Sequence, residues 1–120
     1  MIPNKFHTLI SALSEKTSRD GAFWMKTSNP TEYKLRLETA FITIGYVNDK
    51  EGKSTIDFNV YNLNGDIQDS IKVGSSSEDY NNILAFYNLV QISFSKIDPF
   101  FSTLLNEIQH KPKIGDRRED

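Results

Sequence analysis

The chain has 120 residues, of which 38% are hydrophobic and 25% charged, with a formal net charge of −2 and no cysteine. This length suits one domain, and the composition argues against intrinsic disorder. Without cysteine there are no disulfides, thiolate nucleophiles or cysteine-based zinc sites, and the balance of charge lacks the basic excess typical of nucleic-acid-binding proteins.

The chain carries no recognisable targeting or membrane-spanning pattern. In the opening stretch "MIPNKFHTLISALSEK" the apolar residues are spaced apart, Pro3 comes early, and no continuous apolar region follows Lys5, unlike a signal peptide. Nor do 18 apolar residues run together, so no transmembrane helix is expected. We therefore expect a cytoplasmic protein that does not enter the membrane.

The first predicted element is a helix over residues 3–17. Its apolar residues recur at helical spacing and form one stripe: Phe6, Leu9, Ile10 and Leu13. Asn4 stands where a cap is expected, and Gly21 follows as the break.

From residue 21 to 73 the periodicity is two, which is typical of strands. A first strand at 22–27 joins a second at 32–38 through the turn residues "SNP". The second strand alternates between an apolar and a charged set of side chains, as in a half-solvated antiparallel sheet: Tyr33, Leu35 and Leu37 against Lys34, Arg36 and Glu38. A third strand follows at 40–47.

The next two strands, 55–63 and 66–73, flank Asn64-Gly65. This pair predicts a hairpin with a type I′ turn, because both residues accept positive φ. Asp69 occupies a position where the alternation calls for an apolar residue. We expect it at a bulge or at a sheet edge, where an inward charge discourages pairing with another strand.

The C-terminal part is predicted to be helical. The stretch "GSSSED" supplies caps and acidic residues for a helix over 80–95. Asp98 is placed to cap a continuation that starts with Pro99 and runs to about residue 110. Residues 111–120 are predicted to be a flexible polar tail.

Consecutive strands with short links favour an antiparallel meander, since parallel pairing needs long crossovers. The sequence therefore predicts one α+β domain over 1–110. It has a four- to five-stranded antiparallel meander sheet, with an N-terminal helix and a long or broken C-terminal helix packed on one face.

No pattern in the sequence indicates catalysis, a metal site or a cofactor. His7 and His110 stand near opposite ends, and two histidines alone make a poor metal site. The sequence lacks a G-x-S-x-G elbow and a Gly-rich phosphate loop. We interpret the carboxylates of Asp57, Asp66 and Asp69 as solvated strand residues. We therefore predict a protein that is not an enzyme.

Two features suggest binding. If the first two strands pair, Trp24, Lys26, Lys34 and Arg36 could form one exposed aromatic and basic patch for a partner. In the alternative interpretation, Trp24 packs beneath a helix. The C-terminal helical region is rich in phenylalanine, which either fills the core or forms a homodimer surface: Phe86, Phe94, Phe100 and Phe101.

The chain resembles small uncharacterised single-domain proteins of bacteria and their phages. The likeness rests on a helix that precedes the W-x-K-T-like segment Trp24-Met25-Lys26-Thr27, on the hairpin "YNLNGDI" and on a final helical pair. It spans nearly the whole chain and implies a compact accessory protein. It carries no catalytic residues that could be transferred.

Our leading hypothesis is a non-enzymatic protein-binding module in the style of an immunity, antitoxin or phage accessory protein, acting through a mixed-charge sheet face with an aromatic anchor. One alternative is a small-ligand or nucleotide pocket between the sheet and the C-terminal helix, with polar contacts from Tyr80, Tyr87, Lys34 or Arg36. Another is weak binding of single-stranded nucleic acid by Trp24 and the three cations.

Overall fold

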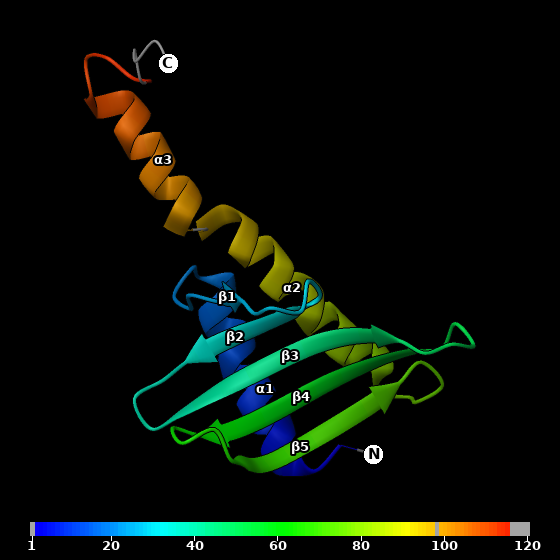
Figure 1. Ribbon diagram of the computed structural model, residues 1–120. Coiled ribbons are helices and arrows are strands. Elements are labelled where there is room, and N and C mark those ends of the chain that lie inside the picture. Colours follow the sequence, from blue (N-terminus) through cyan, green and yellow to red (C-terminus); the bar gives the residue numbers. More distant parts are fainter. Residues whose placement is uncertain (1, 98, 116–120) are drawn as a thin grey trace.

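The computed structural model of the chain describes residues 2–97 and 99–115, without the side chains of 97 and 99–102. Its elements follow the predicted order: α1 (Asn4–Ser18), β1 (Met25–Lys26), β2 (Glu32–Arg36), β3 (Ala40–Asn48), β4 (Ser54–Asn62), β5 (Ile67–Gly74), α2 (Tyr80–Ile97) and α3 (Pro99–His110). The sheet is an antiparallel meander in the order β1-β2-β3-β4-β5. The predicted α+β class and meander topology are confirmed (Figure 1).

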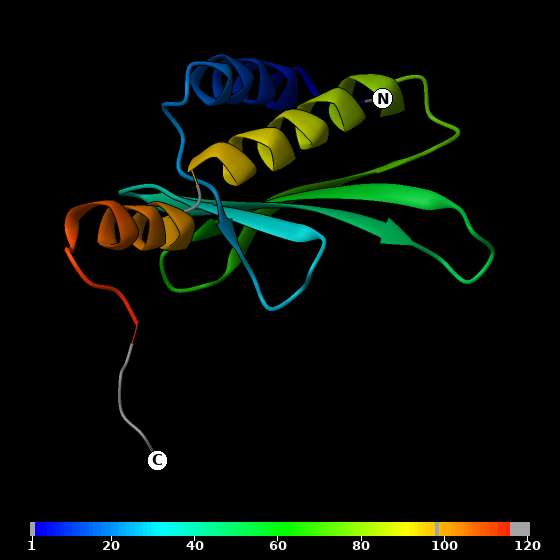
Figure 2. The same cartoon turned by 90° about the horizontal axis from the view of Figure 1, so that it is seen from above.

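The helices cover one face of the sheet and leave the other open. α1 and α2 lie side by side behind the strands in Figure 1 and above them in Figure 2. No described helix lies over the opposite face. α3 continues beyond the end of α2 and projects past the sheet, where Leu104, Leu105 and Ile108 are exposed. The packed part of the predicted C-terminal helix is therefore α2.

The core lies between the sheet and these two helices. Alternation along the central strands turns Ile42, Ile44, Ile56 and Phe58 toward the helices, where they are almost completely buried. The Phe58 ring meets Phe6 of α1 edge-on, with 5.7 Å between ring centres. Each such buried side chain stabilises the fold by roughly 1.5–3 kcal/mol relative to an exposed one.

Trp24 belongs to this core, as in the second of the two interpretations of its role. Its side chain is only 2% exposed, and its indole Nε1 donates a hydrogen bond to the Oγ1 of buried Thr17, 3.1 Å away. The indole also meets the Phe86 ring of α2 edge-on, with 6.0 Å between centres. Trp24 thus joins the end of α1, the start of the sheet and α2.

Two of the four C-terminal phenylalanines also belong to the core. Phe86 is buried, and Phe94 is partly buried against the same cluster. The side chains of Phe100 and Phe101, and Asp98 as a cap, lie outside the described residues. The homodimer and the flexible tail over 111–120 stay predictions.

The ends of α1 differ in detail from the prediction. Pro3, not Asn4, is the N-cap residue, and it makes no side-chain capping bond. At the other end the helix ends at Ser18, and Asp20, one residue before the predicted break at Gly21, is left-handed with φ 58°. The Gly21 amide donates to the carbonyl of Lys16 at 2.8 Å and so helps to close the last turn.

The predicted β4–β5 hairpin forms, but its turn is not type I′. Gly65 has φ 92°, whereas Asp20 is the one non-glycine residue with positive φ in the described part of the chain, so Asn64 is not left-handed. The Gly65 amide donates to the Asn62 carbonyl at 3.0 Å, as in a three-residue loop that ends in a left-handed glycine. The Asn62 side-chain Oδ1 accepts from the amides of Asn64 and Asp66, which favours this longer loop.

Asp69 lies at a bulge on an edge strand, as predicted. Val60 pairs with Asp69 and Tyr61 with Ile67, so Gln68 is the extra residue. The Asp69 carboxylate lies on the helix side and pairs with the Lys5 ammonium of α1, and this hydrogen bond lowers the pKa of Asp69. The inward charge and the bulge both discourage another strand from pairing with β5.

The buried position of Trp24 leads to a stability prediction. Trp24→Ala is expected to lower the free energy of unfolding by about 3–5 kcal/mol, because it leaves a cavity between α1, α2 and the sheet. Phe23→Ala is the matched control: its ring is 62% exposed, so the change should cost less than about 1 kcal/mol. Urea denaturation followed by circular dichroism measures both, and equal effects would place Trp24 outside the core.

Candidate functional site

The register of the first hairpin separates the four residues that were predicted to form a patch. Met25 is opposite Lys34, and Lys26 is opposite Tyr33. Directly opposite residues share a face, so Lys26 lies on the helix side with Tyr33, whereas Lys34 lies on the open face. Arg36 is two residues from Lys34 on β2 and shares its face. With Trp24 in the core, the predicted patch does not assemble.

Lys26 instead closes its own hairpin. Its ammonium donates to the Pro30 carbonyl at 2.6 Å and lies 4.8 Å from the centre of the Tyr33 ring. It is also 5.9 Å from the centre of the Phe94 ring. A cation over two aromatic rings stabilises the turn and the end of α2.

An aromatic stack lies on the open face, on the two central strands. Phe41 of β3 is directly opposite Tyr61 of β4, and their rings stack with 4.7 Å between centres and 14° between planes. The Lys34 ammonium lies 4.2 Å from the centre of the Phe41 ring. Both rings are half-buried. The contacts Lys34–Phe41 and Phe41–Tyr61 are each worth about 0.5–1.5 kcal/mol.

A charged row crosses the same face. Glu32, Gly45, Asp57 and Lys72 are successive partners from β2 to β5. Gly45 is buried, and the Glu32 side chain lies beside it: a Cβ at Gly45 would be 3.6 Å from the Cβ and Cγ of Glu32. The Oδ1 of Asp57 is buried and accepts no hydrogen bond within the described part of the chain. Burial raises the pKa of Asp57, and Lys72 opposes the rise.

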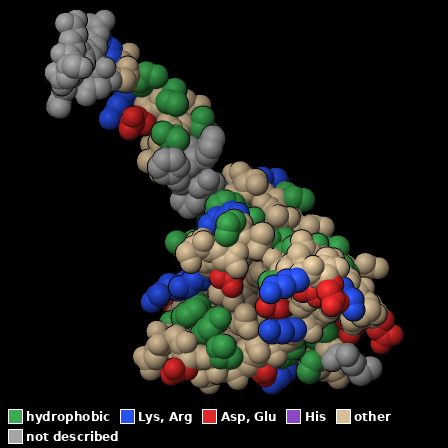
Figure 3. Space-filling view, turned by 45° about the vertical axis from the view of Figure 1, so that its right-hand side comes forward, with side chains coloured by type: hydrophobic (Ala, Val, Ile, Leu, Met, Phe, Trp, Pro, Cys, Tyr) green, Lys and Arg blue, Asp and Glu red, His purple; other side chains and the backbone are tan. Residues whose placement is uncertain are grey.

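A polar row, which consists of Lys34, Thr43, Asn59 and Ser70 from β2 to β5, separates the aromatic stack from the charged row. The Asn59 amide nitrogen donates to the Thr43 hydroxyl at 3.3 Å, and Thr43 is buried beneath its neighbours. In the space-filling view, blue and red side chains are interspersed on the body of the molecule, without a large area of one sign (Figure 3). The open face therefore combines an aromatic end with a mixed-charge surround.

The predicted ligand position between the sheet and α2 holds a shallow hollow of about 240 Å³. Of the four side chains expected to supply polar contacts there, only Tyr87 lines it, because Lys34 and Arg36 are on the opposite face. The Tyr87 hydroxyl donates to the Thr31 carbonyl at 2.7 Å, and burial raises the pKa of Tyr87 to about 12. That hydroxyl therefore serves as a structural link between α2 and the β1–β2 turn.

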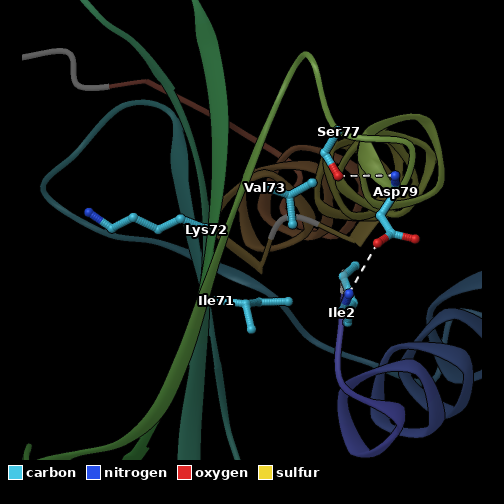
Figure 4. A pocket seen from close by; sticks show the side chains of 6 residues that line it. All are labelled: Ile2, Ile71, Lys72, Val73, Ser77 and Asp79. Atoms are coloured by element: carbon cyan, nitrogen blue, oxygen red, sulfur yellow. Dashed lines mark hydrogen bonds between the residues drawn. The ribbon is translucent and has the colours of Figure 1, made fainter.

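A smaller hollow of about 120 Å³ lies between the chain start, β5 and α2 (Figure 4). The Ile2 amide donates to the Asp79 carboxylate at 3.1 Å, and the Asp79 amide donates to the Ser77 hydroxyl at 3.2 Å. The Lys72 side chain points away from this hollow (Figure 4). These contacts fasten the N-terminal residues to the start of α2.

Within residues 2–97 and 99–115, no group of three His, Cys, Asp or Glu side chains is placed to bind a metal ion. Among the same residues, no helix combines the length and apolar character needed to cross a membrane. Compared with protein-family models, with curated proteins and with solved structures, the chain matches none of them.

Sequence reasoning did not single out Phe41 and Tyr61 as a pair. The available signal was that each aromatic residue occupies the solvent phase of its strand, next to the inward Ile42 and Val60. The sequence does not give the register of β3 with β4, which places the two rings opposite each other. The strongest surface feature of the open face is therefore the Lys34–Phe41–Tyr61 stack.

The raised pKa of Asp57 gives a prediction for pH dependence. The folded protein holds this proton more tightly than the unfolded chain, so the Asp57 contribution lowers stability as pH rises above about 4. Asp57→Asn should remove this effect and raise the free energy of unfolding at pH 7 by less than about 1 kcal/mol, because water screens the partly exposed carboxyl. This difference in the free energy of unfolding between Asp57→Asn and the unchanged chain should vanish near pH 3, where the Asp57 carboxyl is largely protonated in both the folded and the unfolded state.

Urea denaturation at both pH values measures this difference. Glu38→Gln, at an exposed position beyond the end of β2, is the matched loss of one carboxylate. An equal response of the two variants to pH would show that burial does not perturb Asp57.

Proposed function

We propose that this chain is a non-enzymatic protein-binding module that contacts its partner through the open face of the sheet. The observation that carries the proposal is the Lys34–Phe41–Tyr61 stack, which is half-buried on a sheet face that no described helix covers. Aromatic side chains surrounded by polar groups supply most of the binding energy in protein interfaces.

The stack is preorganised for binding. β3 and β4 pair over nine residues each, so the backbone beneath both rings is fixed before a partner arrives. Ring–ring and cation–ring contacts also restrict the side chains. Less conformational entropy is then lost on association, which raises affinity.

The charged row supplies a polar surround with both signs of charge. Glu32 and Asp57 lie next to the polar row of Thr43 and Asn59, and Lys72 is at the end of the charged row. Charges at the rim of an interface select the partner and its orientation more than they add affinity. A mixed-charge surround of this kind is compatible with the immunity, antitoxin or phage accessory role that we expect from the sequence.

The test compares partner capture by sheet-face variants of the tagged chain in the cells that make it. Tyr61→Ala and Lys34→Glu are each expected to weaken binding of the captured partner by at least about tenfold, as for an interface hot spot. Ile92→Ala is the matched control, because Ile92 is 57% exposed on α2, on the helix side of the sheet. Quantitative mass spectrometry followed by titration of the purified partner measures the effect.

Thermal melts of all three variants are recorded first, so that loss of binding is separated from loss of folding. The proposal fails if no stable partner is captured at low salt. It also fails if the captured partner binds the Tyr61 and Lys34 variants as tightly as it binds the unchanged chain.

A further inference from the structure

The backbone edge of β2 is only partly covered by β1. The backbone carbonyl of Glu32 points toward β1, since it accepts a hydrogen bond from the Thr27 amide at 3.3 Å. The backbone amide of Leu37 points toward β3 instead and donates to the Ala40 carbonyl at 2.8 Å. Because backbone groups alternate along a strand, the amide and carbonyl of Arg36 point to the same side as those of Glu32, toward β1. The β1–β2 pairing ends at Met25 and Lys34, and no backbone hydrogen bond joins 22–24 to Arg36 within the described residues. The peptide groups of Arg36 thus form a free strand edge.

An apolar hollow of about 260 Å³ opens beside this edge. The buried side chains of Leu13, Ala22 and Leu35 contribute to its lining. Phe23 and Leu37 also line it, and they are 62% and 43% exposed. Large apolar side chains this exposed around a hollow are typical of a surface that is covered in a complex.

Two cationic residues also line the hollow, Lys16 from α1 and Arg36 from β2, and the Arg36 side chain leaves β2 on the open face, at the rim of the hollow. Both side chains are exposed. Neither forms an ion pair with a described residue, whereas the neighbouring Arg19 is paired with Glu15 at 3.1 Å. Two unpaired positive charges beside an apolar hollow are complementary to a ligand that is both apolar and acidic.

We propose that this hollow and the free edge of β2 bind an extended acidic segment of a partner protein. The segment pairs with the backbone of Arg36 as an added strand, places one apolar side chain in the hollow, and places carboxylates near Lys16 and Arg36. The volume suits a single leucine or phenylalanine side chain. This contact extends the proposed protein-binding function to a second surface, and it does not require the aromatic stack.

The test uses acetylated and amidated seven-residue peptides, titrated by nuclear magnetic resonance against the full chain. The first peptide has a central leucine flanked by glutamates on both sides. Three controls change one feature each: lysines in place of the glutamates, alanine in place of the leucine, and proline next to the leucine, which removes a backbone donor. The acidic leucine peptide is expected to bind at least about tenfold more tightly than each control.

Variants of the chain test the charge contribution directly. The double change Lys16→Glu and Arg36→Glu should weaken binding of the acidic peptide at least about tenfold and make the lysine peptide the preferred ligand. Lys16→Arg with Arg36→Lys keeps both charges and should retain binding. Unchanged Trp24 fluorescence in each variant shows that the core is intact.

Three outcomes overturn the proposal: no binding of the acidic peptide at millimolar concentration, equal binding of the acidic and basic peptides, or unchanged affinity after charge reversal. Tyr61→Ala should leave peptide binding unchanged. The two proposals can therefore fail separately. If the sheet-face variants capture the partner normally and the peptide still binds, the proposed function of the open face is refuted, but the edge site is supported.

Discussion

The arrangement of side chains on the two faces of β2 depends on the register of this strand with its neighbours β1 and β3. With Met25 opposite Lys34, every odd residue of β2 faces the helices and every even residue faces away. A shift of β2 by one residue against both neighbours would exchange Tyr33 and Leu35 with Lys34 and Arg36, which would turn two cations toward the helices. The burial of Trp24 against Thr17 and Phe86 fixes the chain just before β1 and so opposes such a shift.

A sheet covered on one side alone has consequences for its other side. α1 and α2 remove the helix-side isoleucines and phenylalanines from water, but no described helix shields the open face. Its side chains must shield one another, and they do so by stacking Phe41 on Tyr61 and by packing around Thr43. Local packing of this kind leaves rigid, half-exposed aromatic rings, which is the condition that favours a binding surface.

The features that follow from alternation could be predicted from the sequence. The inward set of β2 to β4, the outward cations of β2 and the unusual position of Asp69 all follow from a period of two. Features that depend on pairing across strands could not. The Phe41–Tyr61 stack and the contact of Glu32 with Gly45 require the register. The β4–β5 loop carries two hydrogen bonds to the Asn62 side chain, which the Asn64-Gly65 pair alone does not indicate. A tryptophan is compatible with either face of a short strand. The burial of Trp24 could therefore be predicted only with the position of α1, whose Thr17 accepts its hydrogen bond.

The two proposed contact surfaces meet at Arg36. Across the sheet, Arg36 is opposite Phe41, Phe41 is opposite Tyr61, and Tyr61 is opposite Ile67. A strand added at the free edge of β2 would extend this row by one member, because its residue opposite Arg36 would share the open face. A partner that supplies such a strand would therefore begin at the hollow beside Leu37 and continue directly over the aromatic stack. The shortness of β1 leaves this route open, since two more paired residues at 23 and 24 would close the edge at Arg36.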